Sequence, residues 1–295
     1  MDWWKRRQTG ARGLHSDGAQ TPSHPGESEA FAAPASDTRE INRLDFEHYL
    51  LRQTLQGDFV APIGQPQRIL DVGCGTGRWA HDMSLRFPQA RIVGVDQDLT
   101  AAHAAINRAA LVRQQVRCTF VQGDVLDGLP FPDESFDFVH MRLLFLSLPV
   151  ERWPAVVREL ARVTCKGGWV ELIETTPPRQ LGPALDCICR WCVTLAAAHG
   201  VDLYVAERID SFLRDAGLTG VVSRRLVLPL GPQGGRIGMM VAADDFAYIE
   251  GFRPAILREG IATVEAYAQA VDGAQAELRV GKSMQPFYIA YGQRT

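Results

Sequence analysis

The sequence predicts an α/β fold built on a parallel, doubly wound sheet, and three observations support this prediction. A short apolar run at 68–72 leads into a loop with glycines at 73, 75 and 77. Further strand patterns alternate with helical patterns along the chain, at 91–95, 117–122, 136–141 and 169–174. Acidic residues stand at the ends of several of these strands. Repeated βαβ units form parallel sheets, which bind ligands at the carboxyl ends of their strands.

Composition indicates a globular protein of one large domain or two small ones. The chain has 295 residues, of which 46% are hydrophobic and 22% charged. Its net charge of −3 argues against binding nucleic acid through bulk electrostatics. No apolar run approaches the roughly 18–20 residues that span a bilayer. The six cysteines lack a disulfide-framework spacing and the N-terminus lacks a secretory signal, so we expect reduced thiols in a cytoplasmic protein.

Three regions follow from the residue patterns. Residues 1–37, rich in Gly, Pro, Ser, Thr and Ala, are expected to be disordered. Residues 38–66 are expected to form a helical cap, and residues 67–292 the α/β domain. The other expected elements are helices at 77–86, 99–112, 151–164, 182–198, 204–216, 237–258 and 263–278, a strand at 220–228 and a final strand around 288–291.

The glycine loop is the most informative stretch. Glycines permit positive φ angles and close approach of the backbone to a ligand, and the helix that follows offers free N–H groups. A dinucleotide fingerprint would place its third glycine at position 78, which is Arg78. This spacing disfavours a nicotinamide-dependent oxidoreductase.

The strand ends supply candidate ligand groups. Asp96 ends the second strand, where a carboxylate accepts ribose hydroxyl hydrogens, although it can also cap a helix. Asp124 ends the third strand and can instead be a turn residue. His140 ends the fourth, where a buried structural histidine is an equal alternative. Glu174 ends the fifth, and an orienting role suits it better than that of a base. Asp71, before the glycine loop, can simply cap that loop.

Cysteines at 187, 189 and 192 fall within one predicted helix. Only Cys189 and Cys192 share a face, and the neighbouring apolar residues extend that face into a stripe. A packing surface is therefore favoured over a zinc site.

The pattern D-x-G-x-G-x-G at 71–77 resembles motif I of class I S-adenosylmethionine-dependent methyltransferases. Segments 93–98, 120–125 and 136–142, with Gly167-Gly168, resemble the later motifs. Residues 42–51, 61–63, 138–142 and 168–174 are also similar to the LaeA-like subgroup, so the resemblance covers about 40–292.

This resemblance implies a Rossmann-like sheet of seven strands, the last antiparallel, with lid helices at about 180–203 and 231–283. It implies that S-adenosyl-L-methionine is the methyl donor and that Asp124 takes the adenine amino group. The N-terminal helix, with His48, would close over the donor. The donor-binding residues expected on this basis are Tyr49, Arg52, Asp71, Gly73, Cys74, Gly75, Gly77, Asp96, Gln97, Gly123, Asp124, Val125 and Met141.

The expected function is methyl transfer by in-line displacement to a small, largely apolar metabolite of the natural-product type. The lid sequence is rich in suitable side chains, namely Met239, Met240, Phe246, Tyr248, Phe252 and Met284. Candidates for a base or an acceptor-orienting group are His140, Arg142, Glu174, His199 and Tyr204. The alternatives are a protein or peptide methyltransferase and a donor-binding regulator of secondary metabolism. The methylated atom and the oligomeric state are left open by the sequence.

Overall fold

A computed structural model of the chain describes residues 38–102 and 118–295. Residues 1–37, and the part of the predicted helix 99–112 beyond residue 102, lie outside the described residues. The described residues form one seven-stranded sheet, in the order β3-β2-β1-β4-β5-β7-β6. The strands are β1 (Arg68–Val72), β2 (Arg91–Asp96), β3 (Cys118–Gln122), β4 (Phe136–Arg142), β5 (Thr164–Thr175), β6 (Thr219–Pro229) and β7 (Met284–Gln293).

The predicted sheet is confirmed. β1 pairs in parallel with β2 and β4, β2 with β3, and β4 with β5, whereas β7 runs antiparallel to both β5 and β6. In β1, every residue after Arg68 is buried, as expected for a central strand covered on both faces. The parallel strands therefore present their carboxyl ends at one edge of the sheet.

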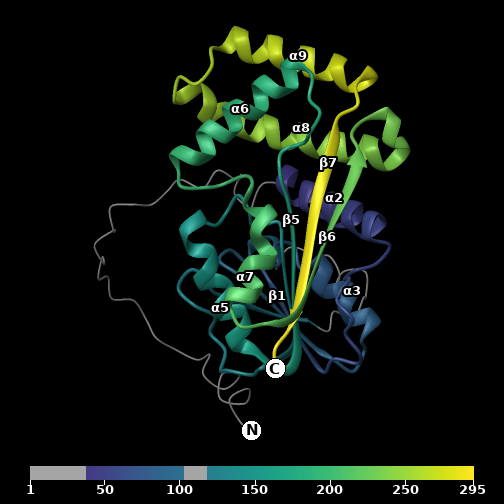
Figure 1. Ribbon diagram of the computed structural model, residues 1–295, viewed down its shortest axis with the longest axis vertical. Helices are drawn as coiled ribbons and strands as arrows, with labels where there is room; N and C mark the ends of the chain where they lie inside the picture. The colour runs from purple at the N-terminus through teal and green to yellow at the C-terminus, as the bar shows by residue number, and fades with distance from the viewer. Residues whose placement is uncertain (1–37, 103–117) are drawn as a thin grey trace, which may run out of the picture.

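Helices cover both faces of this sheet (Figure 1). On one face lies α3 (Arg78–Arg86), whose Trp79 packs with Phe138 of β4. On the other lie α5 (Trp153–Val163), preceded by the 3₁₀ turn η1 (Val150–Arg152), and α7 (Ile209–Asp215), preceded by η2 (Val205–Arg208). Apolar residues of α5 recur at helical spacing, so one stripe of the helix enters the main core.

A second group of helices lies beyond the carboxyl ends of the parallel strands (Figure 1). It contains α6 (Pro183–Ala198), α8 (Gly235–Arg258) with the preceding 3₁₀ turn η3 (Pro232–Gly234), and α9 (Val264–Val280), which together we call the lid. α2 (Thr38–Leu55) contacts α8 and also α3. It therefore lies between the lid and the sheet.

One boundary differs from the prediction at the start of β5. The sequence Lys166-Gly167-Gly168 suggests a turn before a strand that begins at Trp169. In the structure the strand already begins at Thr164, which pairs with Phe136, and the register shifts before Trp169 pairs with Phe138. A Cβ at Gly168 would lie 2.9 Å from the Asp137 carbonyl oxygen, so the glycine belongs to a bulge inside the strand.

A row of polar residues crosses the centre of the sheet. Asp71 of β1 is the register partner of His140 in β4, and His140 is the partner of Glu171 in β5. His140 stacks on Trp79 with ring centroids 3.9 Å apart. Glu171 Oε2 accepts hydrogen bonds from the backbone N–H groups of Val60 (2.7 Å) and Ala61 (2.5 Å), which fixes the segment after α2. Burial raises the pKa of Glu171 to about 7.

Replacing Glu171 by glutamine is expected to stabilise the fold at pH 8 by about 1–3 kcal/mol. The carboxyl group has an ordinary pKa of 4.5 and a folded pKa of about 7, so its contribution to stability is present below pH 4.5 and lost as the pH rises through 7. Glutamine keeps an oxygen for both N–H groups and carries no charge. Urea unfolding at pH 5.5 and pH 8 measures the effect.

The matched control for that substitution is Glu151→Gln, because Glu151 is exposed. The free energy of unfolding of this control, relative to the parent, should not increase between pH 5.5 and pH 8. A Glu171→Gln protein less stable than the parent at pH 8 would contradict the burial argument.

Candidate active site

A cavity of about 310 Å³ opens at the carboxyl edge of the sheet. Its lining comes from the glycine loop, from the ends of β2 and β4, from the segment after β3 and from α2. The volume lies at the lower end of the range typical of small-molecule sites. This is the position at which a doubly wound sheet binds its ligand.

The glycine loop forms one wall of this cavity, which we call the donor cavity. Gly73, Cys74 and Gly75 line it, and both flanking glycines have positive φ angles, of 70° and 50°. The backbone N–H groups of Gly73 and Cys74 donate to the Val95 carbonyl, which ties the loop to β2. Burial raises the pKa of the Cys74 thiol, so this residue is a neutral filler.

Gly77 has a different role from the one predicted for it. It does not line the donor cavity. A Cβ built on Gly77, where φ is 71°, would lie 2.4 Å from the ring of Phe120. The glycine therefore lets the start of α3 pack closely on β3.

The strand-end acids lie where the sequence predicts a nucleoside. Asp96 lines the cavity, and its carboxylate accepts from the backbone N–H groups of Gly75 (2.8 Å) and Asp98 (3.1 Å). Asp124 also lines the cavity and accepts from the Leu126 N–H (2.8 Å), so it is a turn residue as well. The other predicted donor-site residues in the lining are Asp71, Gln97, Gly123 and Val125.

These residues fit a nucleoside donor. Over Gly75 the nearest atom to a built Cβ is Leu44 Cδ1 at 3.5 Å, so the loop leaves room for a ligand against the backbone. Asp96 holds the loop and keeps further lone pairs for ribose hydroxyls.

The three residues predicted at the end of β4 lie in three different environments. Arg142 lines the donor cavity. Met141 is completely buried in the main core and lines neither cavity. His140 is also completely buried, away from both cavities, and its Nδ1 lies 3.3 Å from Asp71 Oδ1. Because burial lowers its pKa, His140 is neutral at pH 7 and supports the Asp71 carboxylate rather than facing a substrate.

Glu174 is likewise a positioning residue in this structure. It is completely buried and lines neither cavity. Its two carboxylate oxygens accept from the backbone N–H groups of Leu144 and Phe145, each at 3.1 Å. The segment after β4 that it holds contributes to both cavities, and burial raises the pKa of Glu174.

The donor-facing side of α2 is not the side predicted. Tyr49 is 40% exposed, and neither Tyr49 nor Arg52 lines the donor cavity. The lining residues of the helix are Glu40, Arg43, Leu44 and Glu47. Successive members of this set are three, one and three residues apart, so they lie on one helical face. This spacing is the sequence signal that could have identified the donor-facing side of α2.

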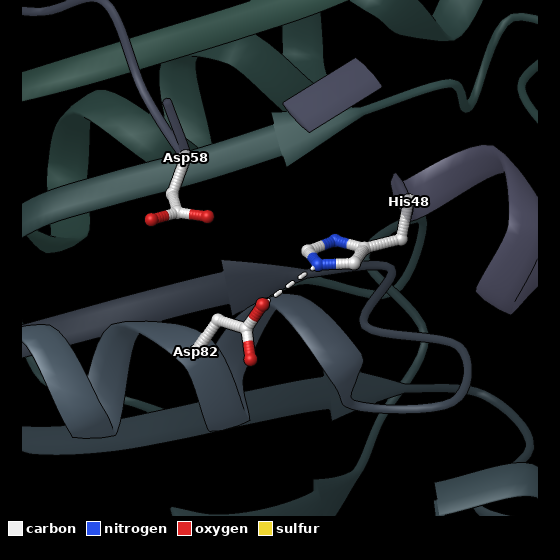
Figure 2. Close-up of side chains that lie close together, drawn as sticks. All are labelled: His48, Asp58 and Asp82. Atoms are coloured by element: carbon white, nitrogen blue, oxygen red, sulfur yellow. Dashed lines mark hydrogen bonds and ion pairs between the residues drawn. The ribbon is translucent and has the colours of Figure 1, made fainter. Parts of the chain in front are cut away.

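His48 belongs instead to a buried polar cluster with Asp58 and Asp82 (Figure 2). The exposed Arg52 pairs with the two carboxylates of this cluster. Arg142 Nη2 donates to His48 Nδ1 (3.0 Å), so the other ring nitrogen carries the proton and donates to Asp82 (3.0 Å). This chain of hydrogen bonds orients Arg142 in the donor cavity.

Figure 2 shows that the imidazole of His48 points toward Asp82, with Asp58 across the gap. Ligand atoms of these three residues lie within 4.8 Å of one another, a spacing that suits a metal ion. Arg52, however, pairs with Asp82 (2.5 Å) and with Asp58 (3.2 Å). The guanidinium already supplies the positive charge that these carboxylates require.

A second, smaller cavity of about 90 Å³ lies beneath the lid. Apolar side chains dominate its lining, and of the predicted lid residues Phe246, Tyr248 and Phe252 contribute. Cys189 and Cys192 line it from α6, in agreement with the packing face predicted for these cysteines. It shares Glu47, Leu143, Leu146 and Tyr248 with the donor cavity, so the two are adjacent. We call it the acceptor cavity, after the acceptor site that the sequence predicts beneath the lid.

Five further predicted residues lie outside the acceptor cavity. Met239 is 51% exposed, and Met240 and Met284 are absent from the lining. His199 Nε2 lies 3.0 Å from Glu259 Oε1 near the surface. The ring of Tyr204 lies beneath the guanidinium of Arg179.

No helix in the described part of the chain is long and apolar enough to cross a membrane.

Comparison with known proteins points to methyltransferases. A family model described as a methyltransferase domain matches residues 69–168. Methyltransferase str2 of Strobilurus tenacellus is 30% identical over 205 residues, which cover 67% of this chain and 70% of that protein. Methyltransferase str3 of the same species is 27% identical and covers 74% of each chain. The secondary metabolism regulator laeA of Aspergillus fumigatus is 30% identical over 66% of this chain, but this match spans only 52% of the regulator.

Solved structures share the fold at low sequence identity. Phosphoethanolamine N-methyltransferase 2 of Haemonchus contortus in complex with S-adenosyl-L-methionine has a TM-score of 0.52 and 18% identity, covering 86% of this chain and 52% of that one. Geranyl diphosphate methyltransferase in complex with the same donor has a TM-score of 0.51 and 19% identity, covering 90% and 94%. At this level of identity the likeness shows the shared fold alone. The predicted cofactor, S-adenosylmethionine, is confirmed by the family match. The match to str2, together with the methyltransferase-domain model, shows that the chain belongs to the class I S-adenosylmethionine-dependent methyltransferases.

Proposed function

We propose that this enzyme transfers the methyl group of S-adenosylmethionine to a small, largely apolar metabolite. The observation that carries the proposal is the acceptor cavity, which adjoins the donor cavity beneath the lid and is lined mainly by apolar side chains. The lining of this cavity matches a small apolar molecule in chemistry.

The chain's own residues would bind, orient and exclude water. The Asp96 carboxylate would accept the ribose hydroxyls, and Asp124 with Val125 would receive the adenine. Arg142, oriented by His48, is one of three arginines that line the donor cavity, with Arg43 and Arg78, and would bind the donor's carboxylate. The donor supplies an activated methyl group, so positioning in a dry site is the main task left to the protein.

Transfer of a labelled methyl group tests this proposal. The protein is incubated with methyl-tritiated S-adenosylmethionine and either an organic extract of metabolites or a protein extract. We expect label in the organic-extractable small molecules. Label found only in protein would favour the protein-methylating alternative. Calorimetry should show binding of S-adenosylhomocysteine and not of NAD, and binding of NAD alone would refute the proposal.

Cys189→Phe is expected to lower methyl transfer at least tenfold while S-adenosylhomocysteine affinity stays within twofold. The added ring would occupy the acceptor cavity, which Cys189 lines, and would leave the donor cavity untouched. Cys187→Phe is the matched control, because Cys187 lies two residues before Cys189 on α6 and lines neither cavity. Equal activity of the two variants would show that the acceptor binds elsewhere.

A further inference from the structure

The charged residues that line the acceptor cavity are all acidic. They are Glu47 of α2 and the adjacent Asp244 and Asp245 of α8, and no lysine, arginine or histidine is found among the described lining residues. Three carboxylates in an otherwise apolar cavity are unusual, because each is costly to bury unless it is paired.

Two of the three carboxylates have partners. Glu47 accepts a hydrogen bond from the Tyr248 hydroxyl (2.7 Å) and lies 3.3 Å from Arg43 Nη1. Asp244 lies 3.5 Å from the same Arg43 nitrogen. Arg43 also pairs with Glu40 (2.7 Å), so a single guanidinium serves three carboxylates.

Asp245 is the carboxylate without a partner. Its Oδ2 is buried and makes no hydrogen bond with any described residue, although Asp245 lines the cavity. Burial and the negative charge of Glu47 both act on the ionisation of Asp245. No cation in the described part of the chain offsets them. Burial first, and then nearby groups that include Asp245, raise the pKa of the Cys189 thiol on α6, which lines the same cavity.

This charge distribution discriminates between acceptors. Where Asp245 is ionised, an anionic acceptor would be repelled by the carboxylates, and a neutral alcohol would leave the charge of Asp245 uncompensated. A cation would pair with Asp245 in a low-dielectric site, where the attraction is strong. The rest of the lining requires that this cation be attached to an apolar body.

We propose that the acceptor carries a protonated amine on an apolar skeleton and that Asp245 binds this amine, an inference that rests on the proposed function. Glu47, which lines both cavities, lies between the amine site and the donor. Asp245 is therefore a specificity-determining residue, and the apolar side chains of the lid enclose the remainder of the acceptor.

The pH dependence of binding has a definite sign. The groups that face Asp245 are Glu47 of α2, Asp244 beside it on α8 and the neutral thiol of Cys189 on α6. Burial and Glu47 raise the pKa of Asp245 to about 8. A primary alkylamine keeps its proton up to about pH 10. Affinity for such an amine should therefore rise from pH 7 to pH 9, as Asp245 ionises, while affinity for the matching alcohol should not.

Three probes that share a phenyl ring on a four-carbon chain and differ in their terminal group test this inference: 4-phenylbutylamine, 4-phenylbutan-1-ol and 4-phenylbutanoate. Binding to the full-length protein is measured by calorimetry at pH 8.5, with and without S-adenosylhomocysteine. We expect the amine to bind at least tenfold more tightly than the alcohol and the carboxylate to bind most weakly. The inference is overturned if the alcohol binds as tightly as the amine or if the amine does not bind.

The variant Asp245→Asn should remove the preference for the amine and leave S-adenosylhomocysteine affinity within twofold. Asp272→Asn, an exposed substitution on lid helix α9, is the matched control and should retain the preference. A preference that survives in Asp245→Asn overturns the role of Asp245. Failure of S-adenosylhomocysteine to bind the parent protein would instead contradict the proposed function, and the donor-free titrations keep the two failures distinct.

Discussion

Replacing Asp96 by asparagine will weaken S-adenosylhomocysteine binding about 10- to 100-fold, which corresponds to about 1–3 kcal/mol. Asp96 ends β2 and lines the donor cavity, and its carboxylate can accept from both hydroxyls of a ribose. Asparagine retains one acceptor oxygen, which the Gly75 N–H already uses at 2.8 Å, and presents an N–H₂ group where the second acceptor was. The variant should therefore keep the Gly75 hydrogen bond and lose the ribose contact together with the hydrogen bond from the Asp98 N–H.

Calorimetric titration measures this loss, and thermal unfolding without ligand checks the fold. Asp96→Ala should lose more affinity than Asp96→Asn and some stability, because it also leaves the Gly75 N–H unpaired. Asp133→Asn is the control, since Asp133 is an exposed aspartate paired with Arg162, remote from the donor cavity. If Asp96→Asn bound S-adenosylhomocysteine as tightly as the parent, the ribose would have to lie elsewhere.

The parts of the site that the sequence predicted well depend on local signals. The glycine spacing, the strand before it and the acid at the end of β2 are all read within a few residues. Their placement then follows from the rule that parallel strands expose their carboxyl ends at one edge. Asp71, Gly75, Asp96 and Asp124 line the donor cavity for this reason.

Depth along a strand explains why His140 and Arg142 separate. They differ by two residues, so they point to the same face of β4, and His140 lies roughly 6–7 Å deeper in the sheet. At that depth it meets Asp71 and Trp79 rather than a ligand. Met141, between them, points to the opposite face and enters the main core. The sequence marks the end of the strand only to within a residue or two, which is too coarse to choose among the three.

The contributions of α2 and the lid depend on tertiary packing. α2 carries many polar residues, so two of its faces are candidates for contact with the donor. Only the position of α8 decides which of these faces lines the donor cavity. Arg43 illustrates this, because it joins Glu47 on its own helix to Asp244 on the lid, 201 residues away. No local pattern in either helix predicts such a pairing, nor the unpartnered Oδ2 of Asp245.

Replacing Gly77 by alanine is expected to destabilise the fold by about 2–5 kcal/mol, the largest effect of any single methyl group added in the glycine loop. The left-handed backbone at Gly77, with φ of 71°, accounts for about 1–2 kcal/mol of this. The remainder arises because the new Cβ would lie 2.4 Å from the ring of Phe120. The ring cannot move freely toward β2, since a Cβ at Gly94 would also lie 2.7 Å from it, which shows how closely Phe120 is packed between the two glycines.

Gly75→Ala is the matched comparison, because it has a similar backbone angle, of 50°, and no atom closer than 3.5 Å to the new Cβ. It should lose only the backbone contribution to stability, but it should weaken S-adenosylhomocysteine binding, since Gly75 lines the donor cavity. Urea unfolding and calorimetry on both variants separate the two roles. Adding Phe120→Leu to Gly77→Ala should restore part of the lost stability by making room for the methyl group. Equal stability losses in the two single variants would show that Gly77, like Gly75, is required only for its backbone angle.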